Sequence, residues 1–388
     1  MKICVIIIIF YFCFVSCEKI RFVFSLFRHG ARSPYKNIDK DNKDIFNVTW
    51  KGESELTGVG KRQHFLIGYK NRLKYIDKYK LLGDTFDPRE IMIYSTPRNR
   101  TIESALAQMQ GLYPPGTGFT LTQSQISNAI PPISDTSSYE HEIQLLSNYS
   151  LPGQMSLIPI YIFYYPENFM QLYDEKLCKG LEGMGKRNQE RKEVKEFLIY
   201  LNETYGDKLL SLISKDKGFG KGFWLNYKQS FAVLDTIISE YWEGVNMDKI
   251  IAALELPNIT AILNDAYKLM FYDLTGNGIN NDYDACIFGM SPIFRRIIEY
   301  MDYKIKMDSL DYNYLNYDLP KLLLFSGHDN SVGAFMGFMK IVFNTKIKYT
   351  YFASNVNLEL FINEDNKYMI RYLFNDEIFG EFNYSLII

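Results

Sequence analysis

Three segments of the chain share one arrangement, in which a short apolar run leads into a polar cluster and then into a helical pattern. The apolar runs are residues 21–27, 91–94 and 322–325. Continuous apolar strands that alternate with helices are typical of a mostly parallel sheet buried on both faces. The sequence therefore predicts an α/β fold, with a mostly parallel sheet and helices on both of its faces.

Polar side chains follow each of the three predicted strands. In open sheets of this kind, ligands bind outside the carboxyl ends of the strands. Because all three clusters fall at that edge, we expect separate loops to bring six side chains to one crevice. These are Arg28, His29, Arg32, Arg100, His328 and Asp329.

The first cluster places two guanidiniums beside one imidazole. Arg28 and Arg32 repel each other and favour a neutral His29, an arrangement that suits an anion bound between them. Arginine forks match the oxygens of a phosphate, and a neutral imidazole beside a phosphate can act as a nucleophile. The alternative is a basic surface turn that happens to contain a histidine.

The middle of the chain has a different composition. Residues 131–165 are rich in Pro, Ser and Tyr, and residues 167–285 carry helical patterns such as 190–201 and 227–242. We expect residues 131–285 to form a mainly helical cap that is inserted into the sheet domain and covers its edge.

The sheet domain itself is expected to comprise residues 18–130 and 286–388. Helix should resume over residues 291–301. Runs of alternating apolar residues at 352–362 and 368–374 predict a terminal hairpin on the sheet.

The N-terminus has the layout of a secretory signal peptide. Lys2 precedes an apolar stretch over residues 3–15, followed by Ser16 and Cys17, so we expect a signal over residues 1–17. The stretch is short for a membrane span, although a single-pass anchor and a lipoprotein signal ending at Cys17 are alternatives. No later segment is long and apolar enough to span a bilayer. The expected location is the secretory pathway, either extracellular or in a lysosome or other acidic vesicle.

Composition, cysteines and glycosylation acceptors bear on the class of partner and on covalent modification. The chain has 388 residues, 47% of them hydrophobic, and a net charge of −2, which argues against nucleic acid as the main partner. Once a signal peptide is removed, Cys178 and Cys286 remain, and they could form one disulfide in an oxidising compartment. Glycosylation acceptors occur at Asn47, Asn99, Asn148, Asn202, Asn258 and Asn383.

The motif set resembles the histidine acid phosphatase family, the acid phosphatase and phytase branch of the histidine phosphatase superfamily. Arg-His-Gly-x-Arg-x-Pro spans residues 28–34, and Leu-Thr-x-x-Gly-x-x-Gln spans 56–63. Ser-Thr-x-x-x-Arg-Thr-x-x-Ser-Ala spans 95–105, and His-Asp stands at 328–329. The chain departs from the family pattern at Pro97, where many members have Asp, and it lacks most of the family's disulfide cysteines.

The resemblance implies a function and a role for each residue. His29 would attack phosphorus and form a phosphohistidine, and Asp329 would protonate the leaving oxygen. The phosphate oxygens would be held by Arg28, Arg32, Arg100 and His328. The implied enzyme is an acid phosphatase acting on small phosphate monoesters, with neither a metal nor another cofactor, and it could be a homodimer.

Two alternatives share this fold and remain open. One is a phytase-like phosphatase of inositol phosphates, and the other is a phosphate-binding module without catalytic activity. Metal-dependent phosphatase chemistry is disfavoured because the chain has only 4 histidines. We expect His64, in a helical pattern, to be structural and His141 to be a solvated histidine.

Overall fold

The computed structural model describes residues 18–36, 38, 50–132, 137–162, 179–210, 212–213, 218–275, 284–309 and 319–386. The predicted signal peptide and Cys178 lie outside these residues, so the signal and the disulfide remain predictions. Cys286 is buried in the core. Among the described helices, none combines the length and the hydropathy that crossing a membrane requires.

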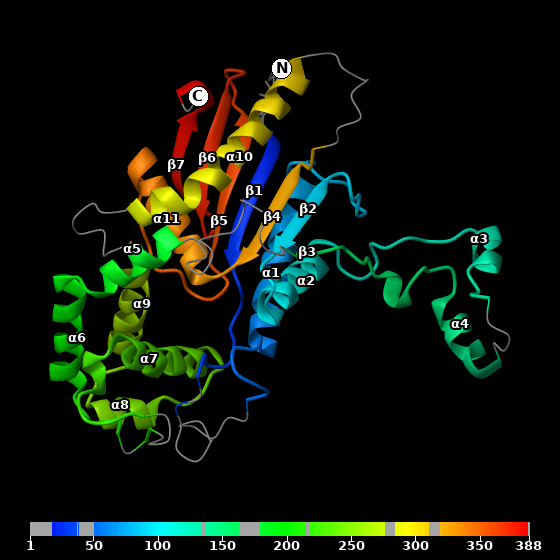
Figure 1. The fold of residues 1–388 in the computed structure, drawn as a ribbon. Helices are drawn as coiled ribbons and strands as arrows, with labels where there is room; N and C mark the ends of the chain where they lie inside the picture. The colour runs from blue at the N-terminus through cyan, green and yellow to red at the C-terminus, as the bar shows by residue number, and fades with distance from the viewer. Residues whose placement is uncertain are drawn as a thin grey trace, which may run out of the picture.

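A seven-stranded sheet in the order β3-β2-β4-β1-β5-β6-β7 forms the centre of the fold (Figure 1). The strands are β1 (Lys19–Arg28), β2 (Ile91–Ser95), β3 (Tyr161–Ile162), β4 (Leu322–Gly327), β5 (Asn355–Ile362), β6 (Tyr368–Phe374) and β7 (Glu377–Asn383). The pairings from β3 to β1 are parallel, as expected, and those from β1 to β7 are antiparallel. The α/β fold is confirmed, but the sheet is mixed rather than mostly parallel, because β5 runs antiparallel to β1 and short turns join β5, β6 and β7.

Helices cover both faces of the sheet, as predicted. Alternate residues of β1 point to opposite faces. Phe22, Phe24 and Leu26 pack in a core with α10 (Asp284–Ser309) and α11 (Asp329–Phe343). Val23 and Phe27 pack in a second core, to which α2 (Asn99–Leu112) and the π-helical segment η2 (Arg72–Lys78) contribute. The helix α1 (Gly58–Asn71) runs into η2 and packs against α2.

A third core belongs to helices at one end of the sheet (Figure 1). These are α6 (Lys192–Tyr205), α7 (Tyr227–Trp242), α8 (Asp248–Leu254) and α9 (Thr260–Thr275), and α5 (Lys179–Gln189) packs against α9. Residues from α6, α7, α8 and α9 line this core, together with Trp224 from the 3-10 turn η6 (Phe223–Leu225). Ala31 and Phe352 also belong to it, so the helical region packs directly on the loops at the sheet edge. We propose that these helices are the inserted cap.

The predicted insertion also contains a strand of the sheet. β3 lies within residues 131–285 and pairs with β2, so we propose that the cap begins after β3. Between β2 and β3 the chain forms the short helices α3 (Gln123–Asn128) and α4 (Glu140–Leu146), which bury no side chain. Figure 1 shows both helices projecting away from the sheet. Short 3-10 turns complete the described elements: η3 (Ser137–Tyr139), η4 (Pro152–Gln154) and η7 (Tyr384–Leu386).

Candidate active site

The carboxyl end of β1 carries the first group of site residues. Arg28 is the last residue of β1, and its N–H donates to the Ser354 carbonyl at 2.8 Å. The N–H of His29 donates to the Gly327 carbonyl at 3.1 Å, and the His29 carbonyl accepts from Ala353 at 3.0 Å. The backbone of His29 is therefore held from both sides, by the end of β4 and by the segment that enters β5.

Close backbone contact joins the first two sequence motifs. A Cβ atom on Gly60 would lie 2.2 Å from the Ala31 carbonyl oxygen, and one on Gly30 would lie 2.4 Å from the Gly60 carbonyl oxygen. Neither position has room for a larger residue. This contact explains why both motifs contain glycine at these positions, since α1 begins directly against the segment that follows His29.

His29 presents one ring nitrogen without a proton. Its Nδ1 lies 2.9 Å from the Gly30 carbonyl, which can only accept, so Nδ1 carries the hydrogen and Nε2 keeps a lone pair. Burial, together with the charges of Arg100 and Arg28, lowers the pKa of His29 well below its ordinary value. The ring is neutral, as the sequence predicted, although the largest single cause is burial rather than the charge of an arginine.

Arg28 and Asp329 form an ion pair across the site. Arg28 Nη2 lies 3.0 Å from Asp329 Oδ2, and Arg28 Nη1 donates to the Thr350 carbonyl at 2.7 Å. Burial would raise the pKa of Asp329, but the charges of Arg28 and Arg32 outweigh it and lower that pKa. Asp329 is therefore ionised in this structure. It is the first residue of α11, so its charge also lies at a helix N-terminus.

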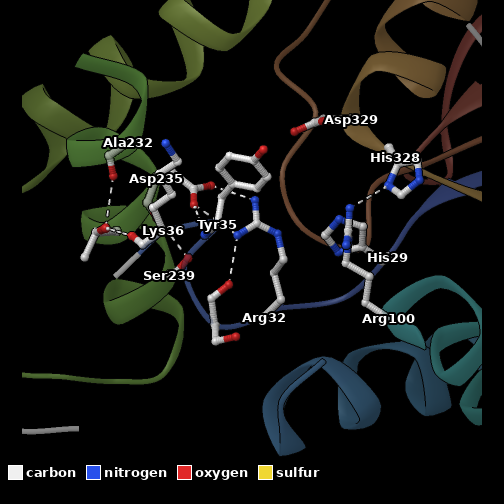
Figure 2. A network of polar contacts seen from close by, with 12 residues as sticks. His29, Arg32, Tyr35, Lys36, Arg100, Ala232, Asp235, Ser239, His328 and Asp329 are labelled. Carbon is white, nitrogen blue, oxygen red and sulfur yellow. Dashed lines mark hydrogen bonds and ion pairs between the residues drawn. The ribbon is translucent and has the colours of Figure 1, made fainter. Parts of the chain in front are cut away.

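Arg32 is held by an acidic residue that sequence reasoning did not identify. Its Nη1 and Nη2 donate to the two carboxylate oxygens of Asp235 at 3.0 and 2.7 Å. Asp235 comes from α7, in the helical region, and it also accepts from the Tyr35 N–H at 2.7 Å (Figure 2). No local motif surrounds Asp235. The available signal was one acidic residue among apolar neighbours in the middle of a helical pattern.

Arg100 and His328 contact each other beside His29 (Figure 2). Arg100 Nη2 lies 3.5 Å from His328 Nδ1, and His328 Nε2 lies 3.0 Å from Thr96 Oγ1. Since a guanidinium only donates, Nδ1 accepts and the Nε2–H donates to Thr96. Burial and the Arg100 charge lower the pKa of His328 to about 3, so this ring is neutral as well. The rings of His29 and His328 lie edge to face, with centroids 5.6 Å apart.

The start of α2 differs from the sequence expectation. The order Thr96-Pro97 predicts a helix with Thr96 as its N-cap and Pro97 at its first position, whereas α2 begins at Asn99, with Arg98 as its N-cap. The Thr96 hydroxyl instead contacts His328 and Thr101. Thr96 therefore helps to position a site residue rather than capping the helix.

An aromatic ring lies close to both arginines of the first motif. The Phe352 ring centroid lies 4.3 Å from Arg28 Cζ and 5.6 Å from Arg32 Cζ. It lies 5.8 Å from the centroid of His29. The negative face of an aromatic ring attracts guanidiniums. Phe352 therefore offsets part of the repulsion between the two cations, and nothing in its local sequence indicated this role.

The other two histidines take the roles that the sequence predicted. His64 is buried, with Nε2 3.0 Å from the Arg28 carbonyl and Nδ1 3.1 Å from the Gln108 amide. Burial lowers the pKa of His64 to about 4. The neutral ring donates from Nε2 to the carbonyl and has no second N–H for Gln108 Oε1. The NH₂ group of Gln108 has no partner among the described residues, so we assign this amide the turned orientation in which it donates to Nδ1. His141 is exposed on α4, which projects away from the sheet (Figure 1).

All six predicted side chains thus lie in one cluster, built from the ends of β1, β2 and β4 and completed by α7. Arg28, His29 and Arg32 are buried in it, and the other three are part-buried. Three guanidiniums face two neutral imidazoles and one carboxylate, an arrangement suited to binding an anion beside a bare ring nitrogen. Among the residues that the structure describes, no group of three or more His, Cys, Asp and Glu side chains could hold a metal ion.

The chain is similar to known phosphatases. Residues 19–138 match the model of the histidine phosphatase superfamily, branch 2. The chain is 37% identical over 99 residues to a lysosomal acid phosphatase of Xenopus laevis, an alignment that covers 25% of this chain and 22% of that protein. It is 27% identical over 226 residues to a prostatic acid phosphatase of Bos taurus, covering 58% of this chain and 52% of the relative. The chain therefore spans about a fifth and about half of these two relatives.

A longer alignment and the solved structures extend the likeness beyond the N-terminal motifs. The chain is 21% identical over 364 residues to a lysosomal acid phosphatase of Pongo abelii, covering 93% of this chain and 72% of the relative. A Klebsiella sp. ASR1 phytase matches with a TM-score of 0.53 at 13% identity, covering 92% of this chain and 83% of that one. A phytase from D. castellii matches with a TM-score of 0.52 at 13% identity, covering 95% and 78%. At this identity the solved structures show a shared fold. The likeness to the histidine phosphatase superfamily, branch 2, is carried by residues 19–138 of the chain.

Proposed function

We propose that the protein is an acid phosphatase, which hydrolyses phosphate monoesters through a covalent phosphohistidine on His29, with Asp329 as proton donor and without a metal. The observation that carries the proposal is the hydrogen bond from His29 Nδ1 to the Gly30 carbonyl. This bond leaves Nε2 of the buried His29 free to attack, within a cluster that contains three guanidiniums. The acid phosphatases among the relatives support the same activity.

The arginines of the site have donors to offer to a phosphate. In the part of the chain that the structure describes, Nε of Arg28, Arg32 and Arg100 is buried and has no hydrogen-bond partner. Buried donors of this kind are costly unless a ligand satisfies them. Phosphate oxygens would do so, and the fixed positive charges would stabilise the charge that builds up on the transferring group.

The ion pair between Arg28 and Asp329 suggests how the proton is controlled. A phosphate dianion would compete for Arg28 and would add negative charge beside Asp329. Both effects raise the pKa of that carboxyl above its value in the free protein. Asp329 would then be protonated only when substrate is present, which is the state a general acid needs. His328, neutral in the free site, would become a better donor in the same way.

The proposed reaction has two steps. In the first, a bond forms between His29 Nε2 and phosphorus, the ester P–O bond breaks, and the leaving oxygen takes the proton of Asp329. In the second, water attacks phosphorus, the P–N bond breaks, and Asp329 takes a proton from the water. Inorganic phosphate leaves, and both residues return to their starting protonation states.

Replacing the nucleophile tests the proposal. With an aryl phosphate at acid pH, His29→Ala should lower kcat by at least roughly a thousandfold. Exposed His141→Ala should leave kcat unchanged, and EDTA should not affect the wild type. After an alkaline quench of labelled substrate, the acid-labile phosphate should be found on His29. Full activity of His29→Ala would refute the mechanism.

A second comparison tests Asp329 and the substrate class. Asp329→Asn should slow hydrolysis of an alkyl phosphate much more than that of a nitrophenyl phosphate, because the latter's leaving group needs less protonation. An equal loss on both substrates would contradict the proton-donor role. Rates on phytate and on simple monoesters distinguish a phosphomonoesterase from a phytase.

We also propose a secretory-pathway location, supported by the lysosomal acid phosphatases among the relatives. N-terminal sequencing of the mature protein would test the predicted signal over residues 1–17, and glycosidase treatment would test the glycosylation acceptors. Ultracentrifugation would test the homodimer.

A further inference from the structure

We propose that Asp235, on α7, is a positioning residue that holds Arg32 in the orientation needed to bind the substrate phosphate. The inference rests on the proposed function and assigns a role to a residue 203 positions after Arg32 in the chain. The helical region then contributes to the site, because α7 holds the Arg32 guanidinium of the motif at residues 28–34.

The hydrogen bonds of Arg32 leave one particular edge available. A guanidinium has five N–H donors. Nη1 donates to the Ser33 carbonyl at 2.9 Å and to Asp235 Oδ2 at 3.0 Å, and Nη2 donates to Asp235 Oδ1 at 2.7 Å. The Nε–H and the second Nη2–H remain, and they lie side by side. These two parallel donors match two oxygens of one phosphate.

The available edge faces the reacting groups. Figure 2 shows the Asp235 carboxylate on one side of the Arg32 guanidinium, with His29 and Asp329 on the other. Arg32 Nε is buried and has no partner among the described residues, so its N–H is available to donate to a bound anion. Asp235 therefore occupies the edge that points away from the site and leaves the inner edge for the anion.

Asp235 is itself rigidly held. Its side chain is fully buried, and Oδ2 also accepts from the Tyr35 N–H at 2.7 Å. Arg32 has several rotatable bonds, and restricting them before substrate binds removes an entropic cost from the binding step. A buried partner with two fixed oxygens supplies that restriction.

A counterion role and a positioning role predict opposite effects. If Asp235 served only to neutralise charge, removing its charge would leave the site more positive and phosphate would bind more tightly. If it positions Arg32, removing the bidentate contact lets the guanidinium turn away, and phosphate binds more weakly. The direction of the change in phosphate affinity therefore decides between the two.

The experiment compares Asp235→Asn with Ser239→Ala, a control on the same buried helix whose hydroxyl donates only to the Asp235 backbone carbonyl. Calorimetry with inorganic phosphate gives Kd, and an aryl phosphate gives KM and kcat. For Asp235→Asn we expect Kd and KM to rise about tenfold with a smaller change in kcat. Ser239→Ala should match the wild type. Unchanged or tighter phosphate binding in Asp235→Asn would overturn the inference.

A double-mutant cycle tests whether Asp235 acts through Arg32. In an Arg32→Ala background, Asp235→Asn should cause no further rise in phosphate Kd, whereas additive losses would overturn the inference. Because Asp235→Asn leaves a buried guanidinium without its charge partner and could unfold the chain, Asp235→Glu serves as the second variant. It keeps the charge but moves the oxygens, so a weaker affinity supports positioning and a wild-type affinity contradicts it.

The phosphate titration separates this inference from the proposed catalytic mechanism. If wild type binds phosphate but His29→Ala keeps full activity, the phosphohistidine mechanism fails and the role of Asp235 is still decided by Kd. If wild type does not bind phosphate, the positioning role fails with it.

Discussion

His64 should make the stability of this protein fall as the pH is lowered. In the folded state its pKa is about 4, because the ring is buried, while the ordinary value is 6.5. The folded chain therefore binds fewer protons than the unfolded chain between these two pH values, and stability is lost as pH falls from about 6.5 to about 4. The gap corresponds to about 3 kcal/mol of unfolding free energy, a large share of the stability of a typical domain.

The comparison with a variant that does not titrate isolates this effect. Gln at position 64 can donate to the Arg28 carbonyl and accept from Gln108, so His64→Gln preserves the polarity of the site. At pH 7 the variant should be less stable, because it loses the packing of the His64 ring against Phe27, whose centroids lie 5.0 Å apart. Wild type should then lose about 3 kcal/mol more than His64→Gln between pH 7 and pH 4.

Urea unfolding at several pH values measures both free energies, and groups that titrate alike in the two proteins cancel from the difference. The two stability curves should converge or cross as the pH falls. Parallel curves between pH 7 and pH 4 would refute the reasoning, since His64 would then titrate alike in the folded and unfolded chains.

Three further predictions concern the site. Gly60→Ala should destabilise the chain by about 3 kcal/mol or more, seen as a lower Tm, since its Cβ would lie 2.2 Å from the Ala31 carbonyl oxygen. A Tm equal to wild type would contradict that contact. Phe352→Leu should raise KM for an aryl phosphate several-fold, because the aromatic face beside Arg28 is lost; an unchanged KM would argue against it. Since the pKa of His29 is lowered well below its ordinary value of 6.5, His29 should stay neutral as the pH is lowered through 6.5. A pH–rate profile should therefore show no loss of kcat/KM with an apparent pKa near 6.5.

The site residues that could be predicted from the sequence are those that follow directly after a recognisable strand. The strands β1, β2 and β4 are continuous apolar runs, and the residues after each run must lie at one edge of the sheet. His29, Arg100 and His328 could therefore be brought together without a structure. β5 and β6 could likewise be predicted, because apolar residues alternate along both.

The residues that were missed depend on contacts distant in sequence. Asp235 looks like any helical acidic residue until α7 is placed against Arg32, and Phe352 looks like a core aromatic. β7 was missed although a signal was present. Asn375 and Asp376 both have positive φ, which is the geometry of a two-residue hairpin turn, and these residue types favour it. Thr96 and Pro97 are residue types that favour a helix start, but α2 begins at Asn99 and the Thr96 hydroxyl contacts His328 instead.

β1 lies where the two halves of the sheet meet, with a parallel neighbour on one side and an antiparallel neighbour on the other. The antiparallel side reaches the site only through the segment before β5, and its outermost strand, β7, contributes no site residue. Fusion tags or added strands grafted beyond β7 should therefore be tolerated. A deletion that removed β5 would instead strip the nucleophile's strand of one of its two supports.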